Sequence, residues 1–460
     1  MVYLGRTRRI HFVGIGGIGM SGIAEVLLNL GFGVSGSDLK RSDTTEKLER
    51  LGAKITYAHE ADNVLGSDVV VYSSAVNATN PELVEAKKHA VPTIRRAEML
   101  AELMRLKFAV TVGGSHGKTT TTSLIASVLA EGGLDPTIVV GGKLRSSSSN
   151  VRLGSSRYLV AEADESDGSF VQLPSSVVVI TNIDLEHMDF YPDLEAIKDG
   201  FVEYASRVPF YGSVIVCVDD ENIRSILPRI RKRKVTYGLW EPADLTGIIL
   251  ERSETGARFN VVHQERLLGD IRISMPGDHY VQNALAAVAV GMDLDVGFDA
   301  IKRGIESFEG VGRRFEIKGT AKGITVIDDY GHHPTEIAAT IRAARRNLKK
   351  RVFVMFQPHR FTRTQALSEQ FGRCFDEAEA VYVADIYPAG EEPIPGVTSE
   401  LLVAAIKRLG HVGVVHSGSF EAMVDAVAER AASGDVVLTL GAGDIYKAGE
   451  RLLEKLKKGN

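Results

Sequence analysis

Short runs of β-branched and aromatic residues alternate with longer amphipathic stretches at both ends of the chain. This alternation predicts parallel α/β sheets, in which helices between the strands cover the sheet. In the N-terminal part we expect strands Ile10–Val13, Gly33–Ser37 and Val69–Ser73, and helices Gly19–Asn29 and Arg95–Leu106. A new strand follows the second helix, so we place the first domain boundary near Leu106, which gives a domain over residues 1–106.

The middle of the chain continues with strands of the buried type and then changes its pattern. The buried strands that we expect are Phe108–Val112, Tyr158–Ala161, Val177–Thr181 and Val214–Val218. Between Lys234 and Met275, alternating strands separated by turn residues predict an antiparallel flap attached to this domain. Its expected strands are Leu250–Ser253, Ala257–Val262 and Arg266–Ser274. A connector rich in Gly and Arg, Gly310–Phe315, ends the domain, which we assign to residues 107–314.

Residues 315–460 return to the first pattern. The strands expected there are Ile324–Asp328, Val352–Phe356, Val381–Ala384 and Val436–Leu440. The sequence therefore predicts an α/β protein of three domains, in agreement with the length of 460 residues. The outer two domains are expected to be Rossmann-like, and the central one to be an α/β domain of the phosphate-loop type with a small flap.

The composition narrows the classes of partner. Hydrophobic residues make up 44% and charged residues 25%, the balance of a globular protein. The formal net charge of −5 gives no electrostatic reason to expect nucleic acid or a membrane as a partner. No apolar stretch approaches the roughly 20 residues of a membrane-spanning helix, and the N-terminus lacks the apolar core of a signal peptide. Cys217 and Cys374 lie far apart, which argues against a disulfide framework or a zinc site. We expect a cytoplasmic protein that holds any anionic ligand in a local site.

Two glycine-rich loops carry candidate chemistry. The first, Gly14-Ile15-Gly16-Gly17-Ile18-Gly19, follows a strand and opens a helix, and Asp38 comes about 20 residues later. Backbone amides at the N-terminus of a helix can cradle a diphosphate. Taken alone, this loop predicts NAD, but a UDP-sugar supplies a diphosphate equally well. A tight turn between strand and helix, without a ligand, is the third interpretation.

The second loop, Gly113-Gly114-Ser115-His116-Gly117-Lys118-Thr119-Thr120, lies between a strand and an apolar helix. It departs from the strict phosphate-loop pattern, because Val112 stands where the first glycine belongs. The shorter loop keeps the groups that bind phosphate in such loops. The amides of Gly114–Lys118 can wrap a phosphate, the Lys118 ammonium can reach terminal phosphates, and the Thr119 hydroxyl can bind Mg²⁺. We therefore predict nucleotide binding here.

Polar residues follow several strands, at the edge where open α/β sheets bind ligands. They are Glu162 and Asp164, Asn182 and Asp184, and Asp328 and Asp329. The first acid after a strand beside the phosphate loop is the usual Mg²⁺ partner, which favours Glu162. We expect Glu165-Ser166-Asp167 to be cap and loop residues. Because Mg²⁺ prefers oxygen ligands, His187 is either a structural histidine or a metal ligand.

The C-terminal domain carries two further motifs. Asp328-Asp329-Tyr330-Gly331-His332-His333-Pro334 places acids, an aromatic ring and histidines ahead of a helix. Gln357-Pro358-His359-Arg360-Phe361-Thr362-Arg363 follows a strand and offers two guanidinium groups, which suit a carboxylate or a phosphate. A solvated cluster of surface charge is the alternative for Arg360 and Arg363.

Together these motifs resemble the Mur ligase family. The phosphate loop, Glu162-Ala-Asp-Glu-Ser-Asp, Thr181-Asn-Ile-Asp-Leu-Glu-His-Met-Asp and Pro276-Gly-Asp-His-Tyr-Val-Gln-Asn283 resemble its central domain. The first glycine loop, Asp328–Glu336, Phe356–Arg363 and Asp385-Ile-Tyr-Pro-Ala-Gly-Glu are similar to the member that adds alanine. The resemblance covers essentially the whole chain, in order.

The resemblance implies an ATP-dependent ligase that joins L-alanine to the lactyl carboxylate of UDP-N-acetylmuramate, through an acyl phosphate, in peptidoglycan precursor synthesis. It also implies Mg²⁺, as two ions, with Mn²⁺ as an alternative. The residues implied for the UDP-sugar are Gly14, Gly16, Gly17, Ile18, Gly19, Asp38, Ser73 and Ser74. Those for ATP are Gly114, Ser115, His116, Gly117, Lys118, Thr119, Thr120, Asn283, Arg314 and Asp328. Thr119, Glu162 and His187 would bind metal, and Tyr330, His332, Arg360 and Arg363 the amino acid. The implied catalytic residues are Lys118, Glu162, His187 and His332.

Two positions depart from the family, and alternatives stay open. Tyr280 stands where members often have Asn, so this position departs from the family on the adenine side. Phe201 or Val202 falls where several relatives carry a carbamylated lysine, so no carbamate is expected. The nearest alternative is the tripeptide-recycling ligase of the same family, which uses the same sugar nucleotide. A nicotinamide-dependent dehydrogenase would leave the second loop unexplained, and a non-catalytic ATP-binding switch is the third alternative.

Overall fold

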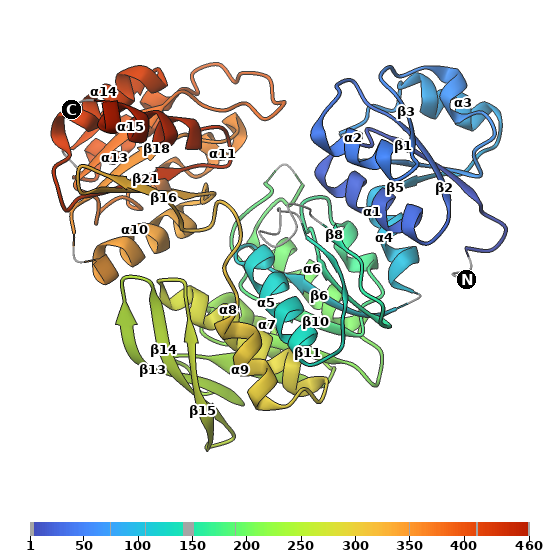
Figure 1. Cartoon of the computed structure of the whole chain (residues 1–460), viewed down its shortest axis with the longest axis horizontal. Coiled ribbons are helices and arrows are strands. Elements are labelled where there is room, and N and C mark those ends of the chain that lie inside the picture. The colour runs from blue at the N-terminus through green and yellow to red at the C-terminus, as the bar shows by residue number, and fades with distance from the viewer. Residues whose placement is uncertain are drawn as a thin grey trace. The chain divides into compact units, whose positions relative to one another are not determined.

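The computed structural model describes residues 4–73, 75–105, 107–140, 151–188, 190–348, 350–410 and 413–458 (Figure 1). The chain divides into two compact units, Met1–Thr246 with Asn283–Ser307, and Gly247–Gln282 with Phe308–Asn460. The domain boundaries predicted at residues 106 and 314 do not coincide with the limits of these units and stay predictions. Within the described ranges, no helix combines the length and the apolar character needed to cross a membrane.

The N-terminal sheet has the strand order β3-β2-β1-β4-β5, and all neighbouring strands are parallel. Its strands are β1 (Arg9–Val13), β2 (Gly33–Ser37), β3 (Lys54–Thr56), β4 (Val69–Tyr72) and β5 (Thr93–Arg95). Its helices are α1 (Ile18–Asn29), α2 (Asp43–Arg50), α3 (Pro81–Lys88) and α4 (Arg96–Met104), with the 3₁₀ helix η1 (Ala61–Val64). Ile10 and Phe12 are fully buried, as expected for a parallel sheet covered on both faces. The chain reverses its strand order between β1 and β4, so the crevice outside their carboxyl ends is the expected ligand site.

The second sheet of the first unit runs β12-β11-β10-β6-β9-β7-β8, with only β8 antiparallel to its neighbour among these described strands. Its strands are β6 (Phe108–Gly113), β7 (Thr137–Val139), β8 (Val151–Arg152), β9 (Tyr158–Glu162), β10 (Val177–Ile180), β11 (Ser213–Cys217) and β12 (Lys234–Gly238). Its helices are α5 (Lys118–Glu131), α6 (Leu194–Ser206), α7 (Glu221–Ile226), α9 (Phe298–Glu306) and, from Asn283 onward, α8 (Asp278–Asp293). Since β9, β6 and β10 are neighbours, the polar residues that follow them come to one edge of the sheet.

An aromatic cluster lies beneath the phosphate loop. The rings of Phe170 and Phe201 meet edge to face at 5.2 Å, and Tyr204 lies 4.9 Å from Phe170. A Cβ atom on Gly113 would lie 3.1 Å from Tyr204 and 3.3 Å from Phe201, so both rings pack directly against the start of the loop. The Tyr204 hydroxyl donates to Thr111 on β6. Phe201, which falls where several relatives carry a carbamylated lysine, therefore belongs to the core that supports this loop.

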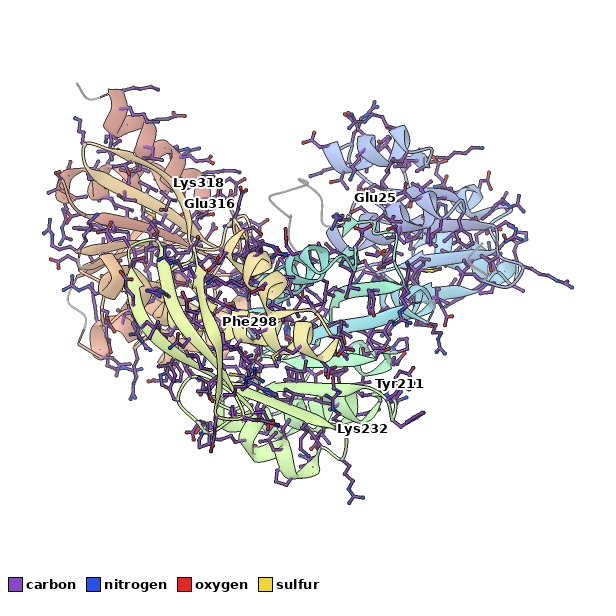
Figure 2. All side chains as sticks on the ribbon, turned by 60° about the horizontal axis from the view of Figure 1, so that its bottom comes forward. Glu25, Tyr211, Lys232, Phe298, Glu316 and Lys318 are labelled. Carbon is purple, nitrogen blue, oxygen red and sulfur yellow. The ribbon has the colours of Figure 1, made fainter. Side chains whose placement is uncertain are left out.

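The C-terminal sheet of the second unit has the order β16-β17-β21-β18-β19-β20, with β16 antiparallel to β17 and the other pairs parallel. Its strands are β16 (Glu316–Ala321), β17 (Ile324–Asp329), β18 (Val352–Phe356), β19 (Ala380–Ala384), β20 (Val414–Gly418) and β21 (Val436–Leu440). Its helices are α10 (Pro334–Leu348), α11 (Phe361–Ala366), α12 (Ser368–Phe371), α13 (Ser399–Arg408), α14 (Phe420–Arg430) and α15 (Tyr446–Lys458). Charges line the edge strand β16, where Lys318 Nζ lies 3.6 Å from Glu316 Oε1 (Figure 2). Charged side chains on an edge strand discourage its pairing with another chain.

The flap predicted from the alternating pattern is present. It contains β13 (Leu245–Ser253), β14 (Gly256–His263) and β15 (Arg266–Ile273). Strands β14 and β15 are antiparallel, with Phe259 opposite Ile271, and both of these side chains are fully buried. The antiparallel flap is thus confirmed. By their contacts, residues Gly247–Gln282 group with the C-terminal unit, whereas the sequence suggested a flap attached to the central domain.

Candidate active site

The phosphate loop has a backbone that glycine adopts most easily at two positions. Gly114 has a φ of 126° and Gly117 a φ of 82°. A Cβ atom on Gly117 would lie 2.9 Å from Asn283 Oδ1 on α8, so space as well as conformation requires a glycine there. Helix α5 begins at Lys118, and the amides of its first turn have no acceptors within the helix. The loop and the helix start therefore offer N–H groups to a phosphate.

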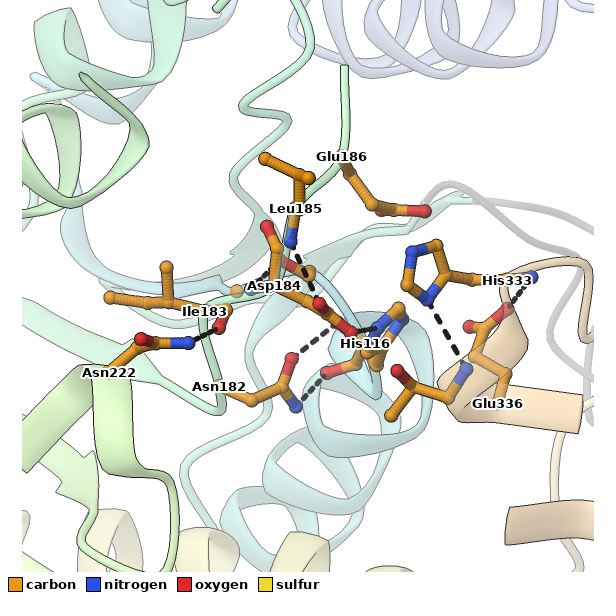
Figure 3. Close-up of polar contacts among 12 residues, drawn as sticks. His116, Asn182, Ile183, Asp184, Leu185, Glu186, Asn222, His333 and Glu336 are labelled. Carbon is orange, nitrogen blue, oxygen red and sulfur yellow. Dashed lines mark hydrogen bonds and ion pairs between the residues drawn. The ribbon is translucent and has the colours of Figure 1, made fainter. Parts of the chain in front are cut away.

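The residues after β10 hold this loop in place (Figure 3). Asn182 Oδ1 accepts the N–H of His116 at 2.8 Å, and Asn182 Nδ2 donates to the carbonyl of His116 at 3.0 Å. The Thr181 hydroxyl donates to the same carbonyl at 2.6 Å. His116 Nε2 lies 3.0 Å from Asp184 Oδ2, and Ser115 Oγ accepts the N–H of Asp184 at 2.8 Å. Ser115 and His116, predicted to meet ATP, thus also set the shape of the loop through their side chains.

Lys118 folds back onto its own loop and onto a buried carboxylate. Its Nζ donates to the carbonyls of Gly114 at 2.6 Å and Ser115 at 3.1 Å, and to Glu165 Oε1 at 2.8 Å. Burial by itself would lower the pKa of Lys118, but the nearby carboxylates, that of Glu165 above all, outweigh burial and raise this pKa to about 12. Lys118 is therefore charged at neutral pH. The next residue, Thr119, is buried in the first turn of α5, as is the Thr that follows it.

Three side chains of the kind that bind metals converge beside Lys118. Glu165, Glu186 and His187 each offer one atom, and these atoms lie within 4.8 Å of one another. His187 Nε2 is 3.4 Å from Glu165 Oε1 and 3.8 Å from Glu186 Oε2. His187 has a φ of 55°, which is uncommon for a residue with a side chain, and backbone strain of this kind clusters at functional sites.

This group fits a divalent cation. Mg²⁺ prefers carboxylate oxygens, and imidazole nitrogen is a ligand of related divalent ions. Glu165 is 2% exposed, and its Oε2 has no hydrogen-bond partner among the residues that the structure describes. Because a buried anionic oxygen without a donor is costly, a bound cation would compensate it. The residues present therefore agree with the magnesium that the resemblance implies.

Glu165 is the site residue that the sequence reasoning missed. The sequence favours Glu162, which ends β9 opposite Val112, and predicts Glu165 to be a cap or loop residue. The loop after β9 instead turns Glu165 toward Lys118. The Tyr191 hydroxyl, from another loop, holds the Glu165 carbonyl at 2.9 Å, a contact that the strand pattern does not reveal. The metal role of Glu162 stays a prediction, and Glu165 joins it as a candidate.

The first glycine loop is anchored on the end of β2. The Ser37 carbonyl accepts the N–H groups of Gly14 and Ile15, each at 2.9 Å. Asp38 Oδ2 accepts the N–H of Gly16 at 2.8 Å. Asp38, predicted to belong to the UDP-sugar site, therefore also shapes the loop that would receive the diphosphate.

The other residues predicted for this site follow the loop or β4. Gly17 precedes α1, and the main chain of Ile18 and Gly19 forms the first turn of that helix. A Cβ atom on Gly19 would lie 2.9 Å from Arg96 Cδ, so this glycine makes room for the arginine. Ser73 directly follows β4, and Ser74 lies outside the described residues.

Asp328 and Asp329 end β17 inside the second unit. Asp328 is fully buried, and it accepts from Arg313 Nε at 3.0 Å and from the Thr439 hydroxyl at 2.7 Å. Asp329 accepts the N–H of Phe315 at 2.7 Å, and burial raises its pKa to about 6. Protein groups thus already bond both acids, and the nucleotide contact predicted for Asp328 stays a prediction.

Arg314, Tyr330 and His332 come together around Glu336. The Arg314 guanidinium lies 5.2 Å from the centre of the Tyr330 ring and 3.6 Å from Glu336 Oε1. Glu336 Oε2 accepts the N–H of His332 at 3.0 Å, and His332 Nδ1 lies 3.1 Å from the Tyr330 carbonyl. One cluster of the second unit therefore contains a residue predicted for ATP and two predicted for the amino acid.

Arg360 and Arg363 lie beyond β18, at the start of α11. Arg360 Nη1 is 3.8 Å from Glu391 Oε1. Arg363 Nη1 donates to His359 Nδ1 at 3.4 Å, and burial lowers the pKa of His359 to about 3, so this imidazole is a neutral acceptor. The rings of His359 and His332 are 5.6 Å apart. The structure thus brings Arg363 into the neighbourhood of His332, through His359.

Tyr280, the departure noted in the sequence, lies in the first turn of α8. It is 4% exposed, and its ring lies 4.1 Å from that of His279. Burial raises the pKa of the Tyr280 phenol and lowers that of His279 to about 4. His279 and Tyr280 therefore form an uncharged pair of rings at the start of α8, with Tyr280 at the position that departs from the family.

Comparisons with known proteins agree with this geometry. Family models match three successive parts of the chain: "Mur ligase family, catalytic domain" over residues 9–108, "Mur ligase middle domain" over 112–291, and "Mur ligase, glutamate ligase domain" over 313–443. Among solved structures, a UDP-N-acetylmuramate–alanine ligase from Thermotoga maritima matches with a TM-score of 0.80 and 29% identity, covering 98% of this chain and 100% of that one. The predicted three-domain Mur ligase architecture is confirmed.

Curated relatives match along the full length. A UDP-N-acetylmuramate–L-alanine ligase from Geotalea daltonii is 53% identical over 454 residues, which are 99% of this chain and 99% of the relative. A protein of the same name from Geobacter sulfurreducens is also 53% identical, over 457 residues and with the same coverage. On this likeness, and on the phosphate loop with its buried lysine and acidic partners, the chain belongs to the Mur ligase family.

Proposed function

We propose that this chain joins L-alanine to the lactyl carboxylate of UDP-N-acetylmuramate, with ATP converted to ADP and phosphate. One observation carries the proposal: the chain matches alanine-adding ligases over almost its entire length. The charged lysine, the two glutamates and the histidine beside its phosphate loop agree with it. The reaction is a step of peptidoglycan precursor synthesis, and because it uses ATP and a UDP-sugar we propose that the protein acts in the cytoplasm.

The chemistry requires an activated acyl group, because a carboxylate does not react with an amine on its own. The lactyl carboxylate attacks the γ-phosphorus of ATP, which gives an acyl phosphate and releases ADP. The free amine of alanine then attacks the acyl carbon. The tetrahedral intermediate collapses to the amide and expels inorganic phosphate.

In the first unit, the phosphate loop would bind ATP, and Lys118 would face its terminal phosphates. In this structure, Lys118 Nζ donates to Glu165 Oε1 at 2.8 Å. Glu165, Glu186 and His187, with Glu162 and Thr119, are the side chains that we assign to a pair of Mg²⁺ ions. Bound Mg²⁺ would neutralise charge on the transferring phosphoryl group.

In the second unit, we assign Arg360 and Arg363 to the carboxylate of alanine. A guanidinium meets a carboxylate through two parallel, charge-assisted hydrogen bonds. His332 is the residue that we assign to take the proton from the alanine ammonium, because it is the imidazole beside Tyr330 and His359.

In the first glycine loop, we place the diphosphate of the UDP-sugar rather than that of NAD. A chain with a separate ATP loop needs a second site for the sugar nucleotide, and the curated relatives are named for one. Isothermal titration should give saturable binding of UDP-N-acetylmuramate. Tight binding of NAD without binding of the UDP-sugar would contradict this assignment.

The proposal is tested by phosphate release with a panel of acceptors. Release should require UDP-N-acetylmuramate, ATP and L-alanine together, which separates the ligase from a switch that merely binds ATP. If the L-alanyl-γ-D-glutamyl-diaminopimelate tripeptide supported turnover and alanine did not, the enzyme would be the recycling ligase instead.

A further inference from the structure

Glu82, in the first turn of α3, is a buried carboxylate in the N-terminal sheet domain, and the proposed chemistry does not use it. Its side chain is fully buried. Oε1 accepts from His11 Nε2 at 3.2 Å and from Asn63 Nδ2 at 2.8 Å. Oε2 accepts from the Ser37 hydroxyl at 2.7 Å and from His59 Nδ1 at 2.9 Å. Each oxygen therefore has two donors.

The energetics of this group argue for a role in positioning. Burial alone would raise the pKa of Glu82, but its four hydrogen bonds lower this pKa overall, so the carboxylate is ionised at neutral pH. Apolar residues of similar volume often replace buried charges without loss of stability, so stability alone does not explain the group. The four donors come from β1, from the end of β2, from the segment after β3 and from η1. Glu82 thus fixes four segments of the domain relative to α3.

Ser37 connects this carboxylate to the first glycine loop. Its hydroxyl donates to Glu82, while its carbonyl accepts the N–H groups of Gly14 and Ile15 at 2.9 Å. The next residue, Asp38, accepts the N–H of Gly16 at 2.8 Å. The first three amides of the loop are therefore held by two adjacent residues, one of which is bonded to Glu82. A displacement of Ser37 would move the loop, and the start of α1 with it.

We infer that Glu82 is a positioning residue for the sugar nucleotide: acting through Ser37, it holds the first glycine loop in the shape that receives the diphosphate. This inference rests on the proposed function, in which UDP-N-acetylmuramate binds at that loop. Glu82 is fully buried, and in this inference it acts only through other residues. Its loss therefore weakens binding of the sugar nucleotide and leaves the ATP chemistry intact.

The test compares Glu82→Gln, Ser37→Ala and the double variant in the full-length enzyme. The dissociation constant of UDP-N-acetylmuramate is measured by calorimetry, and kcat and the KM values of ATP and alanine by phosphate release. Each single variant should bind the sugar nucleotide about tenfold more weakly, the effect of one hydrogen bond to a charged group. The dissociation constant of the double variant should equal that of the single variant that binds less tightly, because both changes break the same connection. The kcat at saturation and the KM of ATP should stay at wild-type values.

Glu85→Gln is the matched control. Glu85 lies one turn further along α3 and pairs with Lys88 and His89 at the surface, without contact to the loop. Its substitution should leave binding unchanged. Glu82→Gln and Ser37→Ala variants that melt at lower temperature but bind like the wild type would overturn the inference, and so would strictly additive effects. If Glu82→Gln does not fold, Ser37→Ala, which removes only a hydroxyl, decides the question. A wild-type enzyme that does not bind UDP-N-acetylmuramate would refute the proposed function instead.

Discussion

Replacing Glu165 by glutamine tests the part of the site that only the structure revealed. The change removes one negative charge and keeps the volume of a side chain that is 2% exposed. In the wild type, Glu165 Oε1 lies 2.8 Å from Lys118 Nζ and 3.4 Å from His187 Nε2. A neutral amide cannot act as the counter-charge of Lys118 or as an anionic metal ligand. We expect the variant to fold and to lose turnover.

The pKa of Lys118 sets the size of the structural effect. It stands near 12, against the ordinary value of 10.5, and this shift of about 1.5 units corresponds to roughly 2 kcal/mol. Because the folded-state pKa of Lys118 is raised, this stabilisation is complete below its unfolded-state pKa of 10.5 and is lost as the pH rises through about 12. That shift is the net effect of burial and of several carboxylates, Glu165 first among them, so at pH 8 the loss of the Glu165 charge should lower the free energy of unfolding by an amount on the order of 2 kcal/mol, less than the usual total of about 5–15 kcal/mol.

The assay is phosphate release at saturating UDP-N-acetylmuramate, ATP and alanine, repeated over a range of Mg²⁺ concentrations. We expect kcat to fall by about 100-fold or more, the usual effect of losing an electrostatic contact to a transferring group. The Mg²⁺ concentration for half-maximal rate should rise. The control is Asp167→Asn in the same loop, because Asp167 accepts only from Ser169 among the contacts described for it. That variant should keep wild-type kinetics.

A folded Glu165→Gln enzyme with wild-type kcat and Mg²⁺ dependence would refute this reasoning. If Glu162→Gln abolished turnover in the same experiment, the acid at the strand end would be the metal ligand, and Glu165 would only hold Lys118.

Three further predictions address other parts of the account. Lys118→Ala should lower kcat by about two orders of magnitude, while the affinity for UDP-N-acetylmuramate, measured by calorimetry, should hardly change; an active variant would remove the ATP-loop assignment. Arg360→Lys and Arg363→Lys should each raise the KM of alanine strongly, since lysine cannot form the two parallel bonds of a guanidinium, and wild-type values for both would make these arginines surface charge. The pKa of Asp329 is raised from 3.8 to about 6, so the folded state holds the proton of this carboxyl more tightly than the unfolded state does. The resulting contribution to the free energy of unfolding, about 3 kcal/mol, is complete below the unfolded-state pKa and is lost as the pH rises through the folded-state pKa. The melting temperature of Asp329→Asn relative to the wild type should therefore increase between about pH 4 and pH 7, and a constant difference would show that the Asp329 carboxyl titrates normally.

Strands that form a clear apolar run were predictable from the sequence alone. The strands at Ile10–Val13, Val177–Thr181 and Val436–Leu440 match β1, β10 and β21 to within a residue or two. Such strands are buried on both faces, and short runs of mainly β-branched and other apolar residues indicate this. Strands β3, β7 and β8, with two or three residues each, were not predicted because so short a segment carries no period.

The site was predictable where a motif fixes the backbone, and not where a loop decides the direction of a side chain. The glycine pattern and Lys118 predicted the second loop, because glycines and their positive φ angles define the backbone of a phosphate loop. Glu165 was missed because its direction depends on how the loop after β9 turns, and a hydroxyl from Tyr191 holds that turn. The contact of Asp38 with Gly16 is likewise a tertiary one that spacing along the chain does not reveal.

The central claim is that the lactyl carboxylate is activated by phosphorylation before alanine attacks it. The most direct measurement uses UDP-N-acetylmuramate labelled with oxygen-18 in that carboxylate, together with ATP and L-alanine, and analyses both products by mass spectrometry. The account predicts an amide between alanine and the muramate, with one labelled oxygen transferred to each phosphate released. Amide formation with unlabelled phosphate, or phosphate release without the amide, would contradict it.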